Sequence, residues 1–152
     1  MLSETTPTLY LTNWSSVRNR PRTWTIMARP RSWEHGEGRV APLTPSGDAL
    51  ALLGYALAER KAGRDSSDAM CCYRAAYEAQ IDAEAHLLRP GALTASLPSG
   101  EGVLLEDGDT LCCACSAEDA RQGRCHRAWA AARLAAAGWR VVLDGAEVVD
   151  AR

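Results

Sequence analysis

The fold is decided by three consecutive segments, DTLCCAC (109–115), CHRAWAAARLAAAG (125–138) and WRVVL (139–143). The first is a continuous apolar run, which is typical of a strand buried on both faces in a parallel sheet. The second is rich in alanine and predicts a helix from His126, with Gly138 placed to end it. The third is again a strand. Strand, helix and strand form a βαβ unit with a right-handed crossover, so we expect a mainly parallel sheet.

Further strands are predicted on both sides of this unit. Residues 8–12 and 23–28 are rich in β-formers, and residues 147–149 have the length of a short edge strand. The segment 29–45 contains several Pro and Gly residues and has no period, so it is expected to be a long loop. Loops of this length are often functional.

Helices are predicted between the two groups of strands. Ser46 is placed to cap a helix over residues 47–59, and a second helix begins near Ser67 or Asp68. Residues 91–97 predict a short third helix. The second helix carries an apolar stripe of Met70, Tyr73, Tyr77, Ile81 and Leu88. We therefore expect one α/β domain over residues 1–152, a three-layer Rossmann-like arrangement with helices flanking the sheet and residues 1–7 as a flexible tail.

Composition limits the class of protein. Hydrophobic residues make up 47% and charged residues 24% of the chain, the balance of a soluble globular protein. No apolar run approaches the roughly 20 residues that cross a bilayer, and the N-terminus shows no secretory signal. We expect a cytoplasmic protein without a membrane partner, in which the six cysteines are thiols, metal ligands or catalytic groups rather than disulfides.

Positive charge is concentrated near the N-terminus. The segment from Arg18 to Arg39 holds six arginines and two glutamates, a local charge of +4, whereas the whole chain has a net charge of −2. Such a segment attracts phosphates or carboxylates, or it is a solvated loop.

The chemistry is predicted where the strand 109–115 leads through a loop into the helix. Ligands of open α/β sheets bind beyond the carboxyl ends of the strands, near the following helix N-termini. Cys113 and Cys115 share one face of the strand and Cys112 points to the other. Cys115 is the better placed to reach a ligand, and Cys112 and Cys113 are expected to be small core residues.

The helix start brings three reactive groups together. Cys125 lies where the helix dipole stabilises a thiolate. The unperturbed pKa of a histidine lies near neutrality, so His126 is suited to act as a general acid or base. We predict Cys125, His126 and Cys115 as catalytic residues. Arg127 at the same helix end is predicted to hold an anionic group of a ligand. The alternative is that Cys125 only packs beneath the helix.

Zinc is the competing interpretation of these residues. Cys113, Cys115, Cys125 and His126 form a four-ligand set of suitable types. The spacing argues against it, because Cys125 and His126 are adjacent and helical side chains that are adjacent diverge by about 100°.

Four further residues are predicted to bind the ligand. Asn13 and Ser15 follow the first strand and should reach the same sheet edge, although turn formation also explains them. Arg18 and Arg29 would hold the ligand's anionic group from the basic segment.

The chain resembles the domain-of-unknown-function 488 family of small bacterial and phage proteins. The resemblance begins at LYLTNWSSVR (9–18), continues through IMAR (26–29) and LTP (43–45), and ends in LCCAC (111–115) and CHR (125–127). It implies an α/β fold and a site that combines Arg18, Arg29, Cys115, Cys125, His126 and Arg127. It implies no reaction.

Three functions follow from these observations. The first is an enzyme that acts on a small anionic molecule, such as a nucleotide or nucleobase derivative, by thiol or acid–base chemistry. The second is a module that binds a nucleotide or nucleic acid without catalysis; the balanced charge and single lysine disfavour general DNA binding. The third is a zinc protein.

Overall fold

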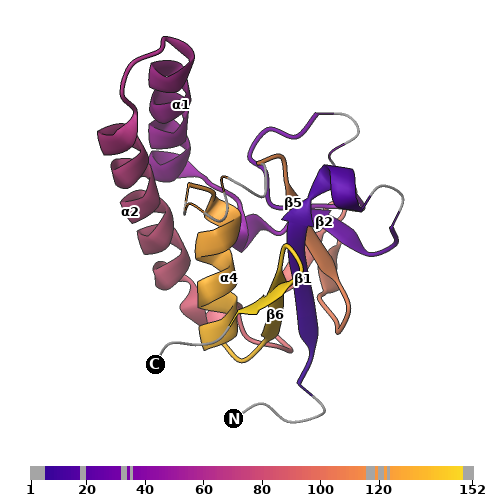
Figure 1. The fold of residues 1–152 in the computed structure, drawn as a ribbon. Coiled ribbons are helices and arrows are strands. Elements are labelled where there is room, and N and C mark those ends of the chain that lie inside the picture. Colours follow the sequence, from indigo (N-terminus) through magenta and orange to yellow (C-terminus); the bar gives the residue numbers. More distant parts are fainter. Residues whose placement is uncertain are drawn as a thin grey trace.

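A mostly parallel sheet of five strands organises the protein (Figure 1). Its strands are β1 (Thr8–Asn13), β2 (Thr23–Thr25), β5 (Thr110–Cys113), β6 (Arg140–Leu143) and β7 (Ala146–Val148), in the order β2-β5-β1-β6-β7. The first four are parallel, and β7 pairs antiparallel with β6. The computed structural model describes residues 6–17, 20–31, 34, 36–115, 119, 122 and 124–148. The expected flexible tail falls largely on residues 1–5, which lie outside the described residues.

The βαβ unit is confirmed. Helix α4 (His126–Ala136) connects β5 to β6, and both strands pair with β1, which lies between them. Gly138 ends the helix with a φ of 112°, the left-handed region that residues with a side chain rarely adopt. In this register Asn13 is paired with Cys113, so the end of β5 lies beside the end of β1.

Helices α1, α2 and α4 lie on the same side of the sheet in Figure 1. Helix α1 (Gly47–Lys61) packs on α2 (Ser67–Ala83), α2 packs on α4, and α4 packs on β1 and β6. The opposite face of the sheet buries Cys112 against Trp14 and Val17, which belong to or follow the short 3-10 helix η1 (Trp14–Ser16). The α/β class and the mainly parallel sheet are confirmed. A three-layer Rossmann-like arrangement is not, because the α-helices of the described chain gather on one face.

The expected helix over residues 91–97 is wrong. A two-stranded antiparallel hairpin stands there, formed by β3 (Thr94–Ser96) and β4 (Gly102–Leu104). Ser96 also exchanges backbone hydrogen bonds with Arg39. The turn reaches a positive φ at Gly100, and Ala95 is buried. Cross-strand pairing and the long loop therefore outweigh the local helix propensity of this segment.

Smaller differences concern the ends of elements. Helix α1 extends two residues beyond the predicted end, and β2 stops at Thr25, three residues short. The loop 29–45 contains the 3-10 helix η3 (Ala41–Leu43), and Leu88 of the predicted stripe lies just beyond the 3-10 helix η4 (Ala85–Leu87). Within the described chain, no helix has the length and apolar character to cross a membrane.

Candidate thiol centre

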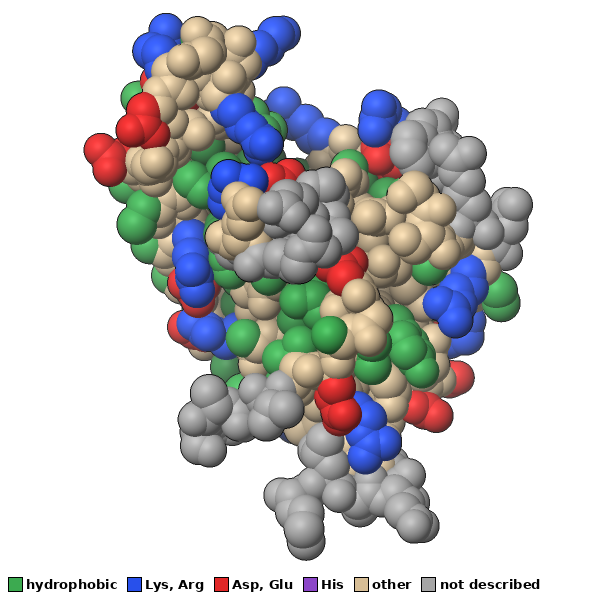
Figure 2. Space-filling view, viewed as in Figure 1, with side chains coloured by type: hydrophobic (Ala, Val, Ile, Leu, Met, Phe, Trp, Pro, Cys, Tyr) green, Lys and Arg blue, Asp and Glu red, His purple; other side chains and the backbone are tan. Residues whose placement is uncertain are grey.

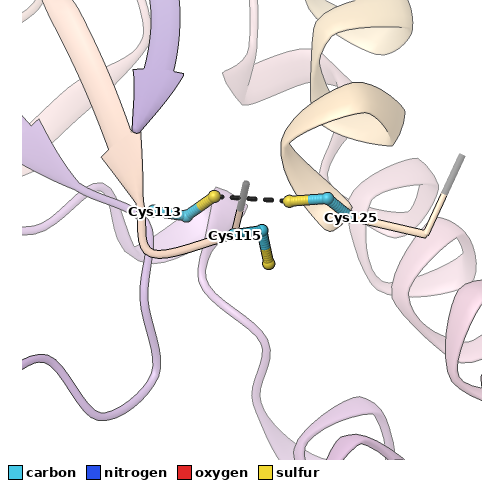
Figure 3. A group of neighbouring side chains, drawn as sticks. All are labelled: Cys113, Cys115 and Cys125. Carbon is cyan, nitrogen blue, oxygen red and sulfur yellow. Dashed lines mark hydrogen bonds between the residues drawn. The ribbon is translucent and has the colours of Figure 1, made fainter. Parts of the chain in front are cut away.

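Three cysteine side chains converge between the sheet and α4 (Figure 3). Cys113 is the last residue of β5, Cys115 lies two residues beyond it, and Cys125 immediately precedes α4. The Sγ atoms of all three lie within 4.8 Å of one another, and those of Cys113 and Cys125 are 3.3 Å apart. The three are free thiols. Two elements that meet at the sheet edge thus bring together residues separated by up to 12 positions in the sequence.

Side-chain alternation along β5 explains which cysteines take part. Leu111 and Cys113 belong to the core between the sheet and the helices, whereas Cys112 is buried on the other face. Cys113 is 1% exposed and Cys115 is partly exposed. The expectation that Cys113 is a core residue is correct for its burial, but it also belongs to the thiol centre.

Cys125 is the N-cap of α4. Its backbone is extended, and its Sγ accepts a hydrogen bond from the Arg127 backbone N–H at 3.4 Å. The thiol thus occupies the place where an N-cap side chain satisfies a free N–H of the first turn. This geometry points the sulfur of Cys125 toward that of Cys113 (Figure 3).

Arg127 connects the thiols to the end of β6. Its guanidinium Nη1 donates to Cys113 Sγ at 2.8 Å and to the Cys115 carbonyl at 3.0 Å. Its Nη2 contacts both carboxylate oxygens of Asp144, at 2.9 and 3.1 Å. Arg127 is fully buried. Its described contacts are therefore with the protein, whereas the sequence predicted a contact with a ligand anion.

Asp144 is a residue that sequence reasoning missed. It follows β6 directly, at the edge where β5 and β1 also end. The rule that carboxyl ends of parallel strands share one edge places it near the predicted site. In the sequence, Asp144 marks only the end of the strand predicted over residues 139–143.

The pKa values of the three thiols are shifted in different directions. Burial opposes ionisation of Cys113, but hydrogen bonds from Cys115 and Cys125 and the nearby charge of Arg127 lower its pKa well below the ordinary value. The Cys113 hydrogen bond raises the pKa of Cys115 to about 12 and also raises that of Cys125. Without a metal ion these contacts therefore favour ionisation of Cys113 over that of Cys115 or Cys125.

His126 faces away from a metal-ligand role. Its Nε2 lies 2.8 Å from the Ile26 carbonyl, and its ring packs edge-on against Tyr77. Burial lowers its pKa, which favours the neutral imidazole. The predicted set of four zinc ligands is thus corrected to a group of three cysteines, because adjacent residues at the start of α4 diverge.

Tyr73 of α2 approaches the centre from the helical side. Its hydroxyl is buried and has no hydrogen-bond partner among the described residues. Burial raises its pKa, and the charges of Cys125, Cys115 and Cys113 raise it further. Tyr73 belongs to the same buried core cluster as Cys113 and Cys125.

The other residues predicted to bind the ligand do not lie together at one site. Asn13 and Ser15 form the turn into η1, where the Asn13 side chain accepts from Ser15 Oγ at 2.6 Å and from the Ser16 backbone. Arg29 is exposed and lines a pocket of about 350 Å³ beside Cys113 and Cys115. Arg18 lies outside the described residues.

The basic segment is partly neutralised within the fold. Arg22 forms an ion pair with Asp109, at 2.5 Å, and Arg31 with Glu34, at 3.0 Å. On the face drawn in Figure 2, Lys and Arg side chains are spread out, several of them beside acidic ones. The local charge of +4 is therefore a weaker attraction for phosphates than its sequence density indicates.

Comparison with known proteins gives no match, whether against protein-family models, curated proteins or solved structures. The resemblance to the domain-of-unknown-function 488 family stays a prediction.

Proposed function

We propose that the protein binds a zinc ion through the thiolates of Cys113, Cys115 and Cys125. The observation that carries this proposal is the convergence of three free Sγ atoms within 4.8 Å of one another. Isolated buried cysteines are usually packing residues, but three sulfurs at one point form the donor set that zinc prefers.

The distances fit such an ion. Zinc–sulfur bonds of about 2.3 Å in a tetrahedron put neighbouring sulfurs about 3.8 Å apart. The separation of 3.3 Å between Cys113 and Cys125 needs only a small expansion, and the remaining pairs lie within 4.8 Å. Cys115 lies outside a regular strand, in the segment between β5 and α4.

The surrounding charges also fit. Three thiolates carry a charge of −3, of which one zinc ion balances two, and the Arg127 guanidinium, itself paired with Asp144, donates a hydrogen bond to the sulfur of Cys113. Arg127 donates to Cys113 Sγ from a position fixed by Asp144, the arrangement by which outer groups orient a metal ligand.

Three protein ligands leave one position of the tetrahedron open. Sites of this kind are catalytic more often than structural, because water or substrate takes the fourth position. An open zinc position lowers the pKa of bound water and polarises carbonyl groups. This chemistry is compatible with the expected enzyme, although the chain itself contributes no fourth ligand among the described residues.

Metal stoichiometry tests the proposal. The protein is dialysed anaerobically against micromolar zinc, and bound metal is measured by elemental analysis. We expect one zinc ion per chain in the natural protein and in Cys72→Ser, whose thiol is exposed on α2. Cys115→Ser removes a partly exposed ligand and should lower the affinity at least about tenfold. A natural protein without zinc, or equal affinity in both variants, contradicts the proposal.

A thiol enzyme that acts on a small anionic molecule without a metal is the second candidate. The pocket beside Cys113 and Cys115, with Arg29 on its lining, is the observation that favours it. The same dialysis separates the candidates, since a folded protein that excludes zinc leaves the thiols themselves as the reactive groups.

A further inference from the structure

We propose that the pocket beside the thiol centre binds a small molecule that occupies the open coordination position of the metal. We infer that it takes a small molecule with three parts: a compact apolar body, a nitrogen or sulfur donor for the open metal position, and an anionic group. This inference rests on the proposed zinc site and adds the class of its ligand.

The walls of the pocket determine the body of the ligand. Leu50, Leu53 and Leu57 of α1 line one side, and Met27 contributes from the segment after β2. The volume of about 350 Å³ is at the lower end of the range for small-molecule sites, which are mostly apolar with a few polar groups. One aromatic ring or a short branched chain fits this space.

The floor of the pocket provides the metal contact. Cys113 and Cys115 both line it, so an ion held by their sulfurs has a side that faces the pocket. A ligand whose apolar body occupies the pocket therefore brings a donor atom to the fourth coordination position. Nitrogen and sulfur donors suit a zinc ion that already has three thiolate ligands.

Arg29 provides the polar anchor. It is exposed, lines the same pocket and forms no ion pair among the described residues. Its neighbours Arg22 and Arg31, in contrast, are paired with Asp109 and Glu34. A guanidinium at a pocket lining with no acidic partner selects a carboxylate or phosphate.

Cobalt substitution makes the open position visible, because the absorption spectrum of cobalt(II) responds to its fourth ligand. The cobalt protein is titrated with imidazole and with 4-phenylimidazole, which have the same donor nitrogen. We expect 4-phenylimidazole to bind about tenfold more tightly, since its ring buries apolar surface in the pocket.

A filled pocket should reduce this difference in affinity. Gly54 lines the pocket in the middle of α1, and a Cβ added there meets open space. Gly54→Leu should therefore fold, bind cobalt as the natural protein does, and reduce the preference for 4-phenylimidazole to less than about threefold. The control is Ala51→Leu, an exposed position of α1 outside the pocket lining, which should keep the tenfold preference.

The anionic part is tested with 4-(imidazol-4-yl)benzoate. We expect it to bind about fivefold more tightly than 4-phenylimidazole, and Arg29→Gln should remove this gain while it leaves 4-phenylimidazole unaffected. If no cobalt spectrum forms, the zinc site itself is refuted. If cobalt binds but imidazole and 4-phenylimidazole have equal affinity, or Gly54→Leu changes nothing, the zinc site stands and the assignment of the pocket is overturned.

Discussion

At the scale of single residues, Arg127 and Asp144 decide how the thiol centre is held. Arg127 is fully buried, and its guanidinium bridges Cys113 Sγ and the Asp144 carboxylate. A buried charge is tolerated only when a counter-charge and hydrogen bonds replace its hydration. Asp144 is therefore a positioning residue for the centre, although it contacts none of the three sulfurs in a described hydrogen bond.

Asp144→Asn should destabilise the protein by about 3 kcal/mol, because it leaves the Arg127 charge buried without its partner. Asparagine tolerates the positive φ of 48° at this position, so the backbone is not the cause. Urea unfolding measures the change. The control is Asp82→Asn, which breaks an ion pair with Arg133 at an exposed carboxylate and should cost less than about 1 kcal/mol. Equal costs for the two variants contradict this role of Asp144.

At the scale of secondary-structure elements, α2 carries two buried tyrosines with different polar environments. Tyr73 and Tyr77 lie one turn apart, and both rings pack near Trp129 of α4. The Tyr77 hydroxyl donates to the Leu43 carbonyl at 2.6 Å and so ties α2 to η3. The Tyr73 hydroxyl has no partner among the described residues. The apolar stripe predicts the burial of both residues and not this difference.

Removal of each hydroxyl should therefore have a different effect on the metal-free protein. Tyr77→Phe loses a buried hydrogen bond and should cost about 1–2 kcal/mol of unfolding free energy. Tyr73→Phe removes a buried group with an unsatisfied hydrogen-bond capacity and should be neutral or stabilising. Denaturant unfolding after metal removal compares the two. A cost for Tyr73→Phe as large as that for Tyr77→Phe would mean that its hydroxyl has a partner in solution.

At the scale of the whole molecule, the helices differ in how firmly they are joined to the sheet. Strand β1 lies between β5 and β6, and α4 packs directly on the sheet. Helix α1 packs chiefly on α2 and buries only Ala49 and Ala56 along its length. In Figure 1, the end of α1 and α2 that is next to the loop connecting them stands clear of the sheet. The pocket of the proposed ligand site therefore has one firm wall and one that depends on α1.

Amide hydrogen exchange should reproduce this order. We expect the amides of β1 and β5 to exchange at the rate of global unfolding, because both strands are paired on two sides. The amides of α1 should exchange faster than those of α2 and α4, since little apolar surface holds this helix. Protection of α1 equal to that of β1 would show that α1 is part of the same cooperative unit as the sheet.

Local patterns in the sequence determine most of the secondary structure. The alanine-rich helix with Gly138 after it and the stripe through Tyr73 and Tyr77 agree with the structure, and β5 covers residues 110–113 of the strand predicted over 109–115. These predictions succeed because the pattern of buried apolar residues and the residues that end a helix are both contained in a few neighbouring positions. The helix predicted over residues 91–97 is wrong because strand β3 depends on distant partners, at residues 102–104 and at Arg39, which a local pattern does not include.

The sequence predicts a site at the junction between Cys115 and Cys125 from the types of residue there. Which of these residues meet depends on the tertiary structure. It placed Cys113 with Cys115 and Cys125, turned His126 toward Ile26, and brought Asp144 to Arg127. These contacts depend on the order of β5, β1 and β6 in the sheet and on the angle at which α4 begins. Such distances are set by packing between elements, which no local pattern of residues encodes.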